Sequence, residues 1–161
     1  ILLILSCNDP HAEYKKNLIQ YQKLVTDVNN YFSNINLKKL DIDKYYTENF
    51  TFYSYPAGNK KGIKKNIREH IEYMEKLKEN GVVLKIGHSI YLPGIDEEKF
   101  TFDGSVRLYY GAYIKTNESE TEFSGYQTIN FINGKIDAIW EWADYGGIAV
   151  QLKSQYINST L

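Results

Sequence analysis

Several residue types that mark common protein classes are scarce in this sequence. One cysteine among 161 residues excludes a disulfide within them. CxxC and HExxH patterns are absent and the three histidines are scattered, so we expect neither a metal site nor a cofactor. The 19 basic and 20 acidic residues nearly cancel, which gives nucleic-acid binding no electrostatic support. No apolar run reaches the ~20 residues that span a bilayer.

Tyrosine, in contrast, is abundant, with 15 copies against 7 Phe and 2 Trp. Its ring is apolar while its hydroxyl seeks a hydrogen-bonding partner, which suits a pocket wall or an interface. An antiparallel sheet also favours Tyr for packing reasons alone. Both interpretations are open.

The first residues are typical of a processed N-terminus. An apolar run ends at Ile4-Leu5-Ser6-Cys7, which resembles the end of a secretory signal followed by a bacterial lipobox. This resemblance implies that residues 1–6 are the remnant of a lipoprotein signal peptide, that Cys7 carries the lipid, and that residues 7–11 form a tether. The protein is then expected on the extracytoplasmic side of a bacterial membrane. The alternative is a buried strand with Cys7 as a core thiol.

Hydrophobic periodicity predicts helices over residues 11–35 and 61–80, with a short helical turn between them at 40–46. In the second long helix, Ile63, Ile67, Met74, Leu77 and either His70 or Ile71 form the apolar stripe. Alternating patterns predict strands at 49–55, 82–92, 100–115, 120–132 and 135–143.

The last two predicted strands are joined by Asn133-Gly134, a strong signal for a type I′ hairpin. Counting outward from this turn pairs Gln127 with Trp140 and Phe123 with Asp144. The face that contains these residues is mostly apolar and is predicted to form a pocket wall. The other face, which contains Ile139 and Glu141, is expected to meet solvent or a second subunit.

The order of elements and the closing segment carry a family resemblance. Asn133-Gly134-Lys135-Ile136, the run from Trp140 to Ile148, and Gln151-Leu152 resemble the end of the SnoaL-like polyketide cyclases, within the nuclear transport factor 2-like superfamily. The resemblance implies an α+β domain over residues 12–153, a curved antiparallel sheet wrapped around N-terminal helices, followed by a tail at 154–161. It also implies a pocket, a homodimer, and an acid/base role for Asp144.

Three functions remain open. The first is a membrane-tethered, non-catalytic pocket for a small apolar or aromatic ligand, lined by residues that include Tyr53, Tyr55, His88, Gln127, Trp140 and Trp142. The second is an acid–base enzyme of the cyclase or isomerase type that uses Asp144. The third is a protein-interaction module that uses the outer sheet face. Asp144 also fits a purely structural role as the cap of the turn at Tyr145-Gly146-Gly147.

Overall fold

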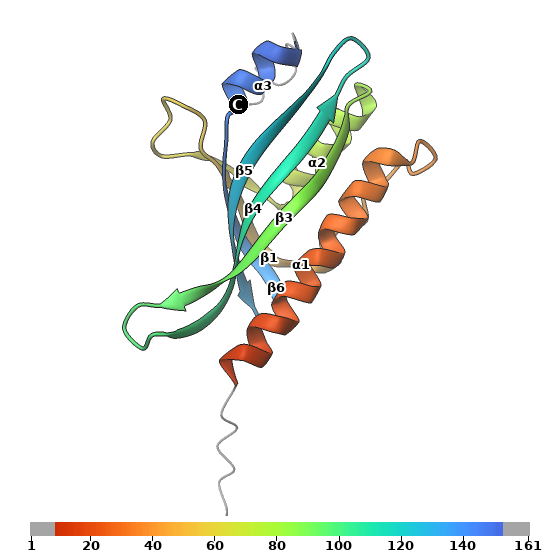
Figure 1. Cartoon of the computed structure of the whole chain (residues 1–161). Helices are drawn as coiled ribbons and strands as arrows, with labels where there is room; N and C mark the ends of the chain where they lie inside the picture. Colours follow the sequence, from red (N-terminus) through yellow and green to blue (C-terminus); the bar gives the residue numbers. More distant parts are fainter. Residues whose placement is uncertain (1–8, 153–161) are drawn as a thin grey trace, which may run out of the picture.

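A computed structural model describes residues 9–152 of the chain, which fold as helices packed against one curved sheet (Figure 1). The α-helices are α1 (Pro10–Ser33), α2 (Ile67–Glu79) and α3 (Tyr145–Leu152), and a 3-10 turn covers Asp43–Tyr45. The strands are β1 (Tyr46–Ser54), β2 (Ile63–Asn66), β3 (Val83–Asp96), β4 (Thr101–Lys115), β5 (Glu120–Ile132) and β6 (Lys135–Ala143), in the sheet order β2-β1-β6-β5-β4-β3. The predicted α+β class and curved sheet are confirmed.

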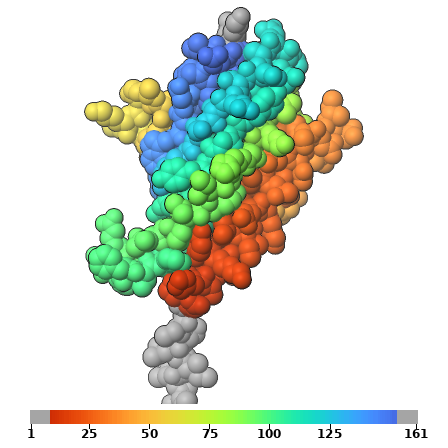
Figure 2. Space-filling model, viewed as in Figure 1, coloured from red at the N-terminus to blue at the C-terminus, as the bar shows by residue number. Residues whose placement is uncertain are grey.

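The sheet is mixed, because β1 runs parallel to β6 while the other neighbours are antiparallel. The family resemblance implies an antiparallel sheet, and this one pairing corrects it. Two strands so far apart in the sequence, such as those that pair Tyr46 with Ile136, leave no local signal of their pairing. Figures 1 and 2 show that the start of α1 and helix α3 lie at opposite ends of the domain, and that the β3–β4 hairpin projects from its body.

Both long helices follow from their apolar stripes and their caps. Asp9 accepts a hydrogen bond from the His11 amide at the start of α1, and Pro10 occupies the first helical turn. Helix α2 begins only at Ile67, because Asn66 and Glu69 form a reciprocal capping box. Residues 63–66, predicted as helix, therefore form β2, which pairs with β1.

The β5–β6 hairpin begins as predicted and then departs from the predicted register. Asn133 and Gly134 both have positive φ, as a type I′ turn requires, and Ile132 pairs with Lys135. A register shift follows, so that Asn130 pairs with Ala138 while Phe131 pairs with Ile136. Asp137 is therefore an extra residue, and this bulge turns every later β6 side chain to the opposite face.

A glycine on β5 makes room for an aromatic ring from β4. Gly125 pairs with Tyr110, and a Cβ atom at Gly125 would lie 2.4 Å from the Tyr110 ring and hydroxyl. That ring is buried and its hydroxyl points toward β6, where it donates to Glu141. The absence of a side chain at Gly125 thus allows the Tyr110 ring to pack over β5.

We predict that Gly125→Ala lowers the free energy of unfolding by about 1–3 kcal/mol, because the new methyl group displaces a packed ring. Urea denaturation measures the change. Gly111→Ala is the matched control on β4, since a Cβ there meets nothing within 4 Å and should alter stability by less than about 1 kcal/mol. Equal losses in the two variants would contradict the prediction.

Candidate functional site

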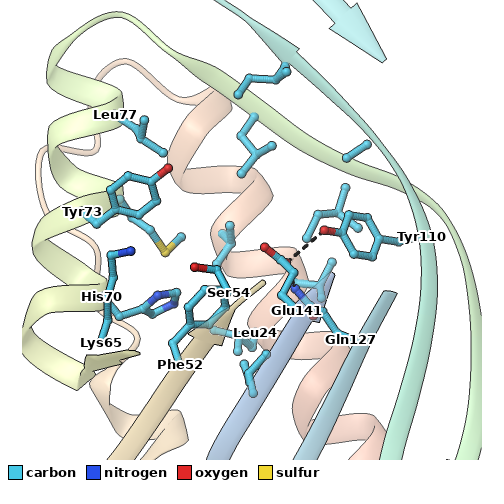
Figure 3. Close-up of a pocket in the computed structure, with 18 of the residues that line it drawn as sticks. Leu24, Phe52, Ser54, Lys65, His70, Tyr73, Leu77, Tyr110, Gln127 and Glu141 are labelled. Atoms are coloured by element: carbon cyan, nitrogen blue, oxygen red, sulfur yellow. Dashed lines mark hydrogen bonds between the residues drawn. The ribbon is translucent and has the colours of Figure 1, made fainter. Parts of the chain in front are cut away.

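A cavity of about 150 Å³ lies between the concave face of the sheet and the helices. Most of its wall is apolar, with Leu24 and Val28 from α1, Met74 and Leu77 from α2, and further side chains from the sheet. Polar groups are few, and Figure 3 shows that they occupy two facing walls. Lys65, His70 and Tyr73 lie on one side, while Tyr110, Gln127 and Glu141 lie on the other.

Glu141 is the centre of the polar wall formed by the sheet. Its Oε2 accepts a hydrogen bond of 2.9 Å from the Tyr110 hydroxyl and another from the Gln127 amide. Its Oε1 accepts from the hydroxyl of Tyr145, at the start of α3. The Tyr21 hydroxyl of α1 in turn donates to Gln127 Oε1, which extends the network to the helix. Three elements, β4, β5 and α3, therefore hold this carboxylate directly, and α1 supports it through Gln127.

The tyrosines of this network remain protonated hydrogen-bond donors. Burial raises the pKa of Tyr110 and of Tyr145, and the nearby Glu141 carboxylate raises both pKa values further. The pKa of Tyr21 is raised for the same two reasons, burial first. Across the cavity, burial and then Glu141 raise the pKa of Tyr73 to about 12.

The wall opposite Glu141 contains a positively charged side chain, that of Lys65. The Lys65 ammonium lies 4.9 Å from the centre of the Tyr73 ring, within cation–π range. Burial lowers the pKa of Lys65, while the charges of Glu69 and Glu141 oppose that shift. Lys65 and Glu141 are the charged residues of the lining, because His70 is held neutral.

His70 is packed in an aromatic cluster on the same side of the cavity as Lys65. Its ring stacks on Phe52 at 4.6 Å and contacts Phe50 and Tyr46. Burial, followed by the Lys65 charge, lowers the pKa of His70 to about 3. His70 is 8% exposed, and its Nδ1 has no hydrogen-bond partner within the described residues; the same holds for the hydroxyl of Ser54, which is 2% exposed.

The residues predicted to line the pocket divide between the two faces of the sheet. Gln127 lines the cavity. Trp140 and Trp142 do not, because the bulge at Asp137 turns them outward, where they stack on Tyr53 and Tyr55 with interplanar angles of 2° and 7°. The predicted pocket positions of these four aromatic residues are thus corrected. His88 is exposed and is also absent from the lining.

Asp144 lies outside the cavity and has a structural role. Its Oδ1 accepts a hydrogen bond of 2.9 Å from the Gly147 amide, and its carbonyl accepts one from the Ile148 amide. The side chain is exposed. Asp144 therefore caps α3, and Glu141 is the acidic residue in the cavity. The hairpin register predicted from the sequence assigned Glu141 to the outer face. The bulge at Asp137 shifts that register and places Glu141 in the cavity.

Within residues 9–152, no helix has the length and apolar character needed to cross a membrane. In the same range, no three His, Cys, Asp or Glu side chains gather as a metal site would require. Cys7, the predicted lipidation site, lies outside the described residues.

We predict that His70 makes the fold sensitive to acid. The unfolded chain binds a proton at His70 near the ordinary pKa of 6.5, whereas the folded chain does so only near pH 3. Above pH 6.5, His70 should therefore not reduce the free energy of unfolding. Below pH 6.5, its contribution should lower the free energy of unfolding by about 1.4 kcal/mol per pH unit. His70→Phe, measured by urea denaturation from pH 7.5 to 5, should lose this part of the slope. His88→Gln, at an exposed position, should keep it; an unchanged slope in His70→Phe would refute the prediction.

Comparison with known proteins identifies solved structures that share this fold. No protein-family model and no curated protein matches the chain. Solved structures do match, including a phenazine biosynthesis-related protein of Pseudomonas aeruginosa, with a TM-score of 0.64 and 10% identity over 90% of each chain. PrhC of Penicillium brasilianum has a TM-score of 0.62 and 15% identity, covering 92% of this chain and 97% of that one.

An LEH-like epoxide hydrolase of M. tuberculosis has a TM-score of 0.57 and 12% identity, covering 86% of this chain and 90% of that one. Identities this low establish shared architecture and leave activity open. The chain therefore shares the curved-sheet α+β fold of these solved structures, in agreement with the fold class that its sequence predicts.

Proposed function

We propose that this domain binds a small, largely apolar molecule in the cavity enclosed by the sheet, α1 and α2. The observation that carries this proposal is the composition of the wall, where apolar side chains surround a few convergent polar groups. That combination is typical of small-molecule sites, in which apolar area supplies affinity and polar groups fix orientation.

The cavity volume limits the ligand. An engineered cavity of about 150 Å³ binds benzene, and this cavity has about the same volume. The ligand is therefore about one substituted ring. A fused polycyclic molecule such as a steroid is larger than this volume.

Catalysis is the second candidate, and Glu141 rather than Asp144 would be its acid or base. The observation in its favour is that a carboxylate and an ammonium group line facing walls of the same cavity. A general base must accept the proton of the substrate, whereas Glu141 already accepts three hydrogen bonds from the protein. Ligand binding without turnover is thus the better-supported function.

Two further proposals concern the membrane attachment and the oligomeric state of the domain. A lipid on Cys7 would hold it at the outer side of a bacterial membrane. A second copy of the chain would pack on the outer sheet face, where Ile90, Leu92, Tyr109 and Trp142 are each more than 40% exposed. Size-exclusion chromatography with light scattering tests the dimer, and mass spectrometry of the protein from bacterial membranes tests the lipid.

We predict that ethylbenzene binds inside the cavity and that Ala112→Leu weakens this binding at least about tenfold. Ala112 is a buried lining residue of β4, so a larger side chain occupies ligand space. Isothermal titration calorimetry measures the affinity, and thermal unfolding checks that the variant folds. Ser124→Leu adds a similar volume at an exposed β5 position and should leave binding intact. If Ala112→Leu binds as well as the wild type, the ligand occupies another site.

A further inference from the structure

Two buried polar atoms of the cavity wall lack a partner among the described residues. They are Ser54 Oγ on β1 and His70 Nδ1 on α2. An unpaired polar atom in apolar surroundings destabilises the fold, so native proteins rarely retain one without a reason. Figure 3 shows Ser54, a lining residue of the cavity, between the two polar walls. A polar atom of a ligand at this position would complete the missing hydrogen bond.

The wall near Ser54 and His70 favours an electron-rich oxygen. The Lys65 ammonium makes the potential of this wall positive. The neighbouring Tyr73 hydroxyl stays protonated, because burial raises its pKa to about 12, and so it can donate. The Ser54 hydroxyl can also donate. The atom that fits this wall is therefore a hydrogen-bond acceptor such as a carbonyl oxygen.

The facing wall requires the opposite chemistry. A carboxylate offers roughly four acceptor positions, and protein donors fill three of those on Glu141. The remaining position suits a donor from the ligand. Lys65 and Glu141 already balance each other's charge on the lining, so a neutral hydroxyl fits there better than a cation.

We propose that the ligand is a single aromatic ring with a hydroxyl group at one end and a carbonyl group at the other. The hydroxyl donates to Glu141, and the carbonyl oxygen accepts from Ser54 on the Lys65 side. This inference rests on the proposed ligand-binding function and names the chemical class of its ligand. The apolar walls, including Phe52 and Leu24, contact the faces of the ring.

A matched set of four ligands tests the proposal on the unmodified full chain. The probes are 4-hydroxyacetophenone, acetophenone, 4-ethylphenol and ethylbenzene, which keep the ring and remove the hydroxyl, the carbonyl or both. Calorimetry should show that loss of the hydroxyl weakens binding about tenfold, and loss of the carbonyl about fivefold, as expected for one charged and one neutral hydrogen bond. Equal affinities for all four would overturn this inference and leave the apolar cavity function standing. Absence of binding by all four would overturn both.

Two variants test the orientation of the ligand. Ser54→Ala should weaken binding of the two ketones about fivefold and leave 4-ethylphenol unaffected. Glu141→Gln should weaken binding of the two phenols about tenfold and leave acetophenone unaffected. Ser124→Ala and Glu122→Gln, at exposed positions of β5, are the matched controls and should change neither. Losses in Ser54→Ala or Glu141→Gln that are uniform across the four ligands would refute the proposed orientation.

Discussion

The carboxylate of Glu141 lies on the concave face of a sheet whose other inward side chains are mostly apolar. A charge in such surroundings is stable only when hydrogen-bond donors replace the lost water. Tyr110, Gln127 and Tyr145 provide those donors from β4, β5 and α3. The relative positions of these elements are thus tied to one group. Tyr110 reaches it because Gly125 has no side chain beneath the ring, and Tyr145 because α3 begins right after the cap at Asp144.

A single inserted residue decides which β6 side chains face the cavity. Asp137 bulges out of the pairing with β5, and the Thr47 hydroxyl donates to its carboxylate at 2.8 Å. Beyond this point Ile139 and Glu141 face inward, and the two tryptophans face outward. Without the bulge, two indole rings would occupy the space that is now the cavity. The bulge therefore creates both the volume of the cavity and its acidic group, in keeping with the frequent occurrence of bulges beside functional sites.

The cavity combines features that weaken a fold and favour a ligand site. His70 is confined in an aromatic cluster that keeps it neutral, and Ser54 is buried without a partner in the described part of the chain. Apolar replacements at both positions would serve packing better. Local sequence rules and the global fold disagree most often at functional sites. Here both unfavourable positions, His70 and Ser54, line the same cavity, which supports the interpretation that it binds a ligand.

The sequence by itself determined the elements whose signals are local. Apolar periodicity located α1 and most of α2, alternation located β4, β5 and β6, and Asn133-Gly134 set the turn between the last two. Tertiary structure decided the rest. The parallel pairing of β1 with β6 joins distant segments, and β2 forms only because β1 lies beside it. The bulge at Asp137 breaks the period-two rule on which face assignment depends. Glu141, the residue at the centre of the site, could therefore be identified only when the strands were seen in register.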